Sequence, residues 1–95
     1  MNFEKARISM VENQLRPNKI KDSRILNIFN EVEKEQFLDN DLISLAYSDV
    51  DLNLIDNRGY LKNLHIAQLI QYSNIQKEDN ILHIGGLTGY VTLLL

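Results

Sequence analysis

The sequence predicts an α/β protein in which a mainly helical front precedes the first parallel strand of a sheet and the start of the helix that follows it. Apolar residues recur at helical spacing through much of residues 1–73. Residues 80–95 combine a short apolar run, a glycine-rich turn and a second apolar run. Because no linker, repeat or low-complexity tract separates these regions, we expect one incomplete domain over residues 1–95.

The composition excludes several classes of protein. Ten basic and 13 acidic side chains give a net charge of −3, which is too small to favour binding to nucleic acid or to an anionic membrane. The absence of cysteine excludes disulfides and thiolate zinc sites. The start is charged where a signal peptide is apolar, and no stretch reaches the roughly 18 apolar residues of a membrane span. We therefore expect a cytoplasmic protein.

The first predicted helix runs from Phe3 to Leu15. Asn2 precedes it with a side chain suited to capping the first turn, and Pro17 should hold Arg16 outside the helical region. The apolar positions that recur at helical spacing are Phe3, Ala6, Met10 and Val11.

A second helix is predicted from a cap at Asp22 or Ser23 to the end of a charged stretch near Gln36. A later apolar segment, residues 42–47, favours one short helical turn packed under the first two helices. The apolar positions of the second helix are Ile25, Leu26, Phe29 and Val32.

Apolar and polar residues alternate between Ser48 and Gly59, which fits either a short strand or an ordered loop. Residues 57–59 should form a turn. The third predicted helix has Asn63 as its cap and ends at residues 73–74. Its apolar positions are Leu64, Ala67 and Ile70, with Leu61 one turn earlier.

The final segment predicts a strand, a turn and the opening of a helix. A polar turn over residues 76–80 leads into the apolar strand 81–84, and residues 85–89 then connect it to a helix that begins near Tyr90. Such a turn presents backbone N–H groups to a ligand and suits the phosphate or carboxylate of a nucleotide-like cofactor. A tight connection without a ligand would use the same glycines, so the pattern alone leaves both interpretations open.

Several short motifs occur in a set order along the chain. They are Met10-Val11-Glu12-Asn13-Gln14-Leu15-Arg16, Phe37, Ala46-Tyr47-Ser48-Asp49, Ile81-Leu82-His83-Ile84-Gly85 and Thr88-Gly89-Tyr90. This ordered set resembles the N-terminal portion of the protein-L-isoaspartate O-methyltransferase family. The resemblance implies a Rossmann-like enzyme of protein repair that uses S-adenosylmethionine as methyl donor. The acceptor would be the carboxylate of an isoaspartyl or D-aspartyl residue in a damaged protein, and the methyl ester would collapse to a succinimide.

By this resemblance, the family's cofactor turn, acidic-x-Gly-x-Gly-x-Gly, falls on residues 83–89. His83 then stands at the acidic position and Leu87 at the second glycine, where a side chain obstructs close approach of the backbone to a ligand. Gly86 would replace that glycine if the turn were shifted by one residue. The implied cofactor-binding set is His83, Gly85, Gly86, Leu87, Thr88, Gly89 and Tyr90.

On the acceptor side, the family's Thr-Ile-Ser-x-Pro stretch corresponds to residues 60–64, which contain neither the serine nor the proline. The resemblance leaves Asp49, Leu61 and Lys62 as candidates for substrate binding. Asp49 serves equally well as a turn or cap acceptor. We assign no catalytic residue, because the carboxylate nucleophile is already ionised and the sulfonium is already a good leaving group.

No metal site is predicted. The acidic side chains Asp49, Asp51 and Asp56 lack the central glycine and the closing glutamate of a calcium loop. His65 and His83 are the only histidines and lie far apart in the sequence, which favours structural roles over metal binding.

Two other functions are compatible with the sequence. A non-enzymatic helical module that binds a partner through the leucine-rich C-terminal segment would need no cofactor. A dinucleotide-binding protein is disfavoured because the Gly-x-Gly-x-x-Gly order is not met. For the methyltransferase, we expect this chain to be inactive by itself, because a doubly wound sheet needs several further βα units. Its uncovered apolar surface should favour self-association.

Overall fold

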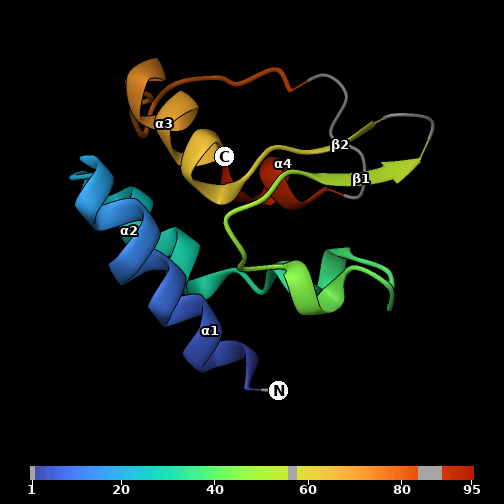
Figure 1. The fold of residues 1–95 in the computed structure, drawn as a ribbon. Coiled ribbons are helices and arrows are strands. Elements are labelled where there is room, and N and C mark those ends of the chain that lie inside the picture. The colour runs from blue at the N-terminus through green and yellow to red at the C-terminus, as the bar shows by residue number, and fades with distance from the viewer. Residues whose placement is uncertain (1, 56–57, 84–88) are drawn as a thin grey trace.

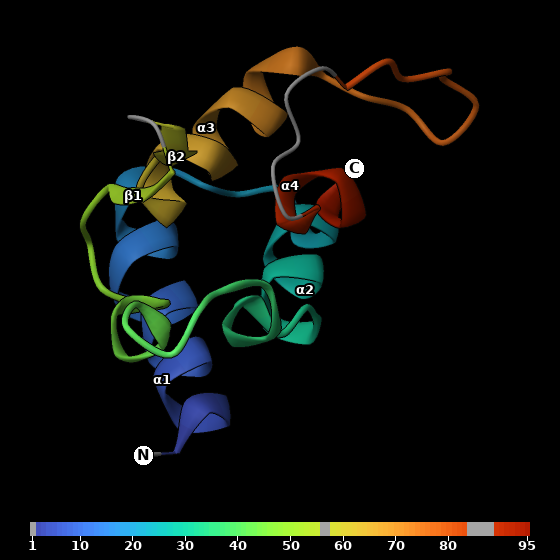
Figure 2. The same cartoon turned by 90° about the vertical axis from the view of Figure 1, so that its right-hand side faces the viewer.

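The computed structural model describes residues 2–55, 58–83 and 89–95. Within these residues the α-helices are α1 (Phe3–Met10), α2 (Ser23–Glu31), α3 (Asn63–Ser73) and α4 (Tyr90–Leu94), and the strands are β1 (Leu52–Ile55) and β2 (Arg58–Tyr60). Figure 1 shows the two strands beside α4, away from the N-terminus. In Figure 2, α4 lies below α3 and above α2, so the end of the chain returns to the helical part.

The first helix extends further than the sequence predicted. Asn2 caps α1 as expected, since its side chain accepts a hydrogen bond of 3.0 Å from the Lys5 backbone N–H. A π-helical turn and a 3₁₀ turn then continue α1 through residues 11–18. The prediction that Pro17 would hold Arg16 outside the helical region is wrong, because Arg16 has φ −60° and ψ −45°. Pro17 lies in the first turn of the 3₁₀ helix, where its missing N–H is not needed.

The second helix is shorter than predicted. Asp22 is its cap, and the carboxylate accepts a hydrogen bond of 2.9 Å from the Arg24 backbone N–H. The helix ends at Glu31 rather than near Gln36, because the next residue is already extended, and residues 34–37 form a separate 3₁₀ turn. The short helical turn predicted within residues 42–47 is confirmed as a 3₁₀ turn at Ile43–Leu45.

The third helix has the predicted end but a different start. Asn74 closes α3 in the left-handed conformation with φ of 52°. Asn63 is not its cap: Lys62 occupies the cap position without a side-chain hydrogen bond, and Asn63 is the first helical residue with a fully buried side chain. The side chain of Asn63 therefore has a role in the buried interior rather than at the helix cap. Sequence spacing alone does not show this difference.

The alternation near residue 52 forms an antiparallel strand pair, which decides between the strand and the loop left open by the sequence. Leu52 pairs with Tyr60, and Asn53 pairs with Gly59. The predicted turn at residues 57–59 is wrong for Arg58 and Gly59, which belong to β2. Residue 57 lies outside the described residues.

The predicted parallel strand over residues 81–84 is not assigned. Residues 81–83 have no regular secondary structure, and residue 84 lies outside the described part. A strand needs a neighbour to complete its hydrogen-bond ladder, and the one described sheet is the antiparallel pair β1–β2. The polar turn before this segment is confirmed by the 3.0 Å hydrogen bond from the Asp79 N–H to the Gln76 carbonyl. The helix start at Tyr90 is also confirmed.

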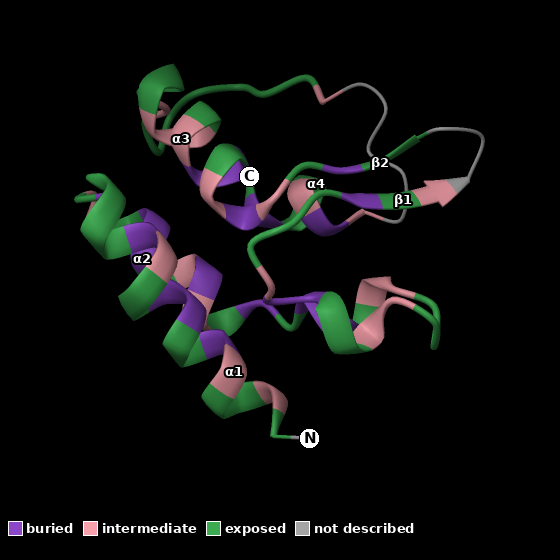
Figure 3. Cartoon of the chain, in the orientation of Figure 1, coloured by how far each residue is buried: buried purple, intermediate pink, exposed green. Residues whose placement is uncertain are grey.

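The core is formed by buried residues at the end of α1, in the π-helical turn that continues it, and in α2, α3 and α4, and Figure 3 shows buried stretches in these elements. A second apolar set remains exposed just before and on α3, on the segment before α4, and on α4 and the residue after it. None of the described helices has the length and apolar character needed to cross a membrane. The exposed apolar set is Leu61, Leu69, Tyr72, Ile81, Leu82, Leu93 and Leu95.

We expect Gly59→Ala to destroy the β1–β2 pairing. A Cβ at this position would lie 1.7 Å from the Leu52 backbone oxygen, and backbone atoms cannot yield as a flexible side chain can. The expected loss of stability is about 3 kcal/mol by chemical denaturation. Amide exchange should show loss of protection in the strands before the helices. Retained strand protection in this variant would contradict the geometry.

Candidate functional site

Of the predicted cofactor turn, residues 83–89, the structure describes the two ends, His83 and Gly89. Gly85, Gly86, Leu87 and Thr88 lie outside the described residues. Gly89 has φ of +99°, a conformation that glycine adopts without the steric cost paid by other residues. Its geometry explains why a glycine stands immediately before α4.

Tyr90 is fully buried rather than open to a ligand. Its backbone N–H, at the start of α4, donates a hydrogen bond of 3.2 Å to the Tyr60 hydroxyl. Its ring packs edge-on against that of Tyr60, with centroids 5.8 Å apart, and against Phe37 at the same distance. Burial raises the pKa of Tyr90 far above its usual value. These contacts support a structural role for Tyr90 at the end of the turn.

His83 is half-buried and is held by α4. Its Nδ1 lies 2.7 Å from the hydroxyl oxygen of Thr92, a contact between the segment before the turn and the helix after it. Val91 of the same helix lines a cavity together with His83. The imidazole is therefore fixed beside the described end of the turn.

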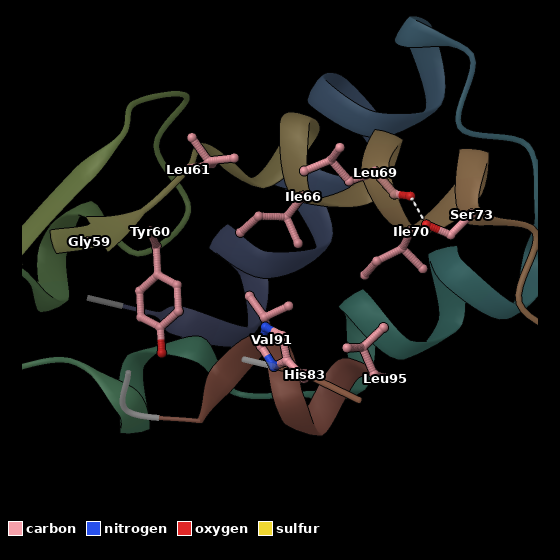
Figure 4. Close-up of a pocket in the computed structure, with 10 residues that line it drawn as sticks. All are labelled: Gly59, Tyr60, Leu61, Ile66, Leu69, Ile70, Ser73, His83, Val91 and Leu95. Atoms are coloured by element: carbon pink, nitrogen blue, oxygen red, sulfur yellow. Dashed lines mark hydrogen bonds between the residues drawn. The ribbon is translucent and has the colours of Figure 1, made fainter. Parts of the chain in front are cut away.

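This cavity has a volume of about 340 Å³ and a mainly apolar wall. Figure 4 shows Leu61, which follows β2, and His83, from the segment before α4, among its lining residues. Leu61, a candidate for the acceptor side, and His83, a candidate for the cofactor side, thus line the same cavity. The complete lining is Gly59, Tyr60, Leu61, Ile66, Leu69, Ile70, Ser73, His83, Val91 and Leu95.

The other acceptor-side candidates lie outside this cavity. Asp49 is exposed, and Lys62 is half-buried at the cap position of α3. The carboxylate that binds the backbone here is Asp51, which accepts a hydrogen bond of 2.7 Å from the Lys62 N–H. The structure thus brings Leu61 to the cavity but not Asp49 or Lys62.

A buried cation that the sequence patterns do not indicate lies beside these residues. Lys34 is 1% exposed, and its ammonium donates a hydrogen bond of 2.7 Å to the Asn63 side-chain oxygen. It lies 5.3 Å from the ring centroid of Tyr90 and 5.7 Å from that of Tyr60. No carboxylate pairs with it among the described residues, and desolvation lowers its pKa to about 8. A lysine within a run of charges gives no sequence signal of burial.

A second buried polar cluster adjoins the first. Arg7 lies 3.3 Å from a Glu35 carboxylate oxygen and donates to the Asn30 carbonyl at 2.6 Å. The Tyr47 hydroxyl donates to Glu35 and accepts from the Lys34 backbone N–H. Burial, followed by the hydrogen bond with Glu35, raises the pKa of Tyr47 to about 12. The hydrogen bond with Tyr47 raises the pKa of Arg7. This cluster ties α1 to the 3₁₀ turns.

The described residues hold no group of three or more His, Cys, Asp or Glu side chains placed to bind a metal ion. What they offer instead is a fixed imidazole, an apolar cavity and a rigid connection between β2 and α4. Such a framework can hold a bound group in a fixed orientation.

The geometry and the sequence patterns define part of an α/β domain with a glycine-marked turn before a helix. The family described as protein-L-isoaspartate (D-aspartate) O-methyltransferase matches residues 5–95. The chain belongs to this family of methyltransferases.

Curated relatives carry the same name. The protein-L-isoaspartate O-methyltransferase of Petrotoga mobilis is 35% identical over 95 residues, which is all of this chain and 45% of the relative. A Syntrophobacter fumaroxidans relative is also 35% identical, over all of this chain and 44% of its own length. The Brucella anthropi relative is 32% identical, over 99% of this chain and 43% of its own length. The chain therefore spans less than half the length of these relatives.

We expect the chain to become more stable as the pH rises from 8 to 10. The folded-state pKa of Lys34, about 8 against 10.5 for a free lysine, means that the unfolded chain binds more protons in this window. The free energy of unfolding should rise by about 1 kcal/mol per pH unit. Above pH 10 the free energy of unfolding should fall, because burial raises the pKa of Tyr47 to about 12. The unfolded chain then loses the Tyr47 proton at a lower pH than the folded chain does.

Urea denaturation at several pH values measures this profile. Lys34→Met should remove the rise, whereas Lys77→Met, at an exposed position, should keep it. A flat profile between pH 8 and 10 in the unmodified chain would show that Lys34 is not desolvated as described.

Proposed function

We propose that this chain is part of an S-adenosylmethionine-dependent methyltransferase that esterifies isoaspartyl or D-aspartyl carboxylates in damaged proteins. The observation that carries the proposal is family membership across residues 5–95. The cavity adds support, because it joins the acceptor-side candidate Leu61 to the cofactor-side candidate His83.

In the proposed reaction, a carboxylate oxygen of the acceptor attacks the methyl carbon of the sulfonium donor. The bond between that carbon and sulfur breaks, and the products are a methyl ester and S-adenosylhomocysteine. No proton needs to be removed from the nucleophile. The protein contributes by holding donor and acceptor in line, which is worth several kcal/mol when the geometry is right.

The donor would be held by the turn over residues 83–89, with Gly86 or Leu87 at the closest approach of the backbone. His83 would present its imidazole to the donor's methionyl group, with Thr92 fixing the ring through Nδ1. The Tyr90 N–H already has Tyr60 as its partner, so Tyr90 would act by placing the turn. Asp49, Leu61 and Lys62 remain the proposed acceptor-side residues, and Leu61 has the strongest support.

The proposal places residues 1–95 in a single incomplete domain of the cytoplasm, with residues 80–95 contributing the first parallel strand and its helix to a larger Rossmann-like sheet. The share of the relatives' length that the chain covers supports this. The members of the exposed apolar set within residues 81–95 also support this, because a neighbouring strand and further helices would cover them. We expect no methyl transfer from this chain alone and no binding to nucleic acid.

The first test is a calorimetric titration of the folded chain with S-adenosylhomocysteine. We expect saturable binding, and His83→Ala should weaken it by about tenfold, the effect of losing one hydrogen bond to a charged group. His65→Ala is the matched control, because His65 is exposed on α3.

Absence of heat from a chain that circular dichroism shows to be folded would contradict donor binding by these residues. It would favour a non-enzymatic interaction module, for which the exposed apolar set is the specific observation.

We further expect the chain to self-associate. Leu82 is 85% exposed within the apolar set, so Leu82→Lys should shift sedimentation towards the monomer. Ile8→Lys, which changes an exposed apolar residue of α1, should leave the association unchanged. A monomer at concentrations of about 100 μM would contradict a large uncovered apolar surface.

A further inference from the structure

Tyr60 lies at the junction between the two sides of the proposed site. It is the last residue of β2 and is followed directly by Leu61 and Lys62, the acceptor-side candidates. Its side chain is buried, and its hydroxyl accepts the hydrogen bond from the Tyr90 N–H at 3.2 Å. One residue thus contacts both the strand that leads to the acceptor side and the helix that follows the cofactor turn.

The Tyr90 N–H is a group that needs a partner. The first N–H groups of a helix have no acceptor within the helix, and a buried N–H without a partner costs about 1 to 3 kcal/mol. Gly89 lies just before this residue with φ of +99° and provides no side-chain cap. The Tyr60 hydroxyl supplies the missing acceptor from another element and fixes the place where the turn enters α4.

Tyr60 is itself held on three sides. Its backbone pairs with Leu52 in the antiparallel sheet. The Lys34 ammonium, 5.7 Å from the Tyr60 ring centroid, also binds the Asn63 side chain at the start of α3. The ring packs edge-on against Tyr90 with an interplanar angle of 87°. The hydroxyl therefore cannot move without displacing the end of β2 or the start of α3.

We propose that Tyr60 is a positioning residue that couples the proposed acceptor side, at Leu61 and Lys62, to the start of α4 at Tyr90. A shift of Leu61 and Lys62 on acceptor binding moves Tyr60, and Tyr60 moves the N–H with which α4 begins. Tyr60 is not a catalytic residue, because it acts through Tyr90. The coupling rests on the proposed function, whereas the hydrogen bond to Tyr90 can be tested independently of it.

The hydrogen bond is tested by nuclear magnetic resonance of the unmodified chain and of Tyr60→Phe. In the unmodified chain, the Tyr90 amide should be protected from exchange. Tyr60→Phe keeps the ring and should raise the Tyr90 exchange rate at least tenfold and shift its amide proton upfield, with unchanged exchange in α1. A Tyr90 amide that is unprotected in the unmodified chain overturns the proposal without any variant, so the test does not depend on the folding of Tyr60→Phe.

Two controls separate positioning from general destabilisation. Tyr47→Phe removes a buried hydroxyl that bonds Glu35 and the Lys34 N–H, so it should lower stability without a selective change at Tyr90. Tyr72→Phe removes the hydroxyl of a residue that is 75% exposed, and it should change neither the stability nor the exchange of the Tyr90 amide. A selective Tyr90 response in the Tyr47 variant equal to that in the Tyr60 variant overturns the proposal.

Titration with S-adenosylhomocysteine then separates this proposal from the proposed function. If the unmodified chain binds, Tyr60→Phe should weaken binding about tenfold, and unchanged affinity overturns the coupling. If the unmodified chain does not bind, the proposed function fails for this chain and the coupling fails with it. The resonance data then decide only whether Tyr60 fixes the start of α4.

Discussion

The burial of the Lys34 ammonium is the constraint on which the arrangement around the site depends. Removing an ammonium from water is costly unless polar or aromatic groups replace the lost hydration. The replacements come from Asn63 at the start of α3 and from the rings of Tyr60 and Tyr90. Because these groups belong to three different elements, the cation is accommodated only while β2, α3 and α4 stay together.

The cluster of Arg7, Glu35 and Tyr47 extends this constraint to the front of the chain. Lys34 and Glu35 are neighbours, and the Lys34 backbone N–H donates to the Tyr47 hydroxyl at 3.0 Å. Arg7 joins α1 to the same carboxylate. Buried polar networks of this kind are directional, so they fix a single arrangement where apolar packing alone would tolerate several. The result is a rigid support for the proposed turn.

Family membership and geometry carry different parts of the functional argument. Membership over residues 5–95 supports methyl transfer as the chemistry. The geometry shows that His83 contacts Thr92 and lines the same cavity as Leu61. Methyl transfer to an ionised carboxylate depends mainly on alignment. For the proposed reaction, rigid connections between elements would therefore matter more than an acid or a base.

Local patterns predicted the presence of α1, α2 and α3, the cap at Asn2, a cap at Asp22 or Ser23, the end of α3 at residues 73–74 and the resemblance to the family, because these depend on local spacing, on capping and on an ordered set of motifs. The ends of the first two helices and the start of α3 differ from the prediction. The hydrogen bond between the buried side chains of Lys34 and Asn63, and the one from the Tyr90 N–H to the Tyr60 hydroxyl, follow from the three-dimensional fold. Each of those contacts joins residues 29 or more positions apart, and no local pattern records them. The strand predicted over residues 81–84 needs a neighbouring strand for its hydrogen bonds, so local sequence could not establish it either.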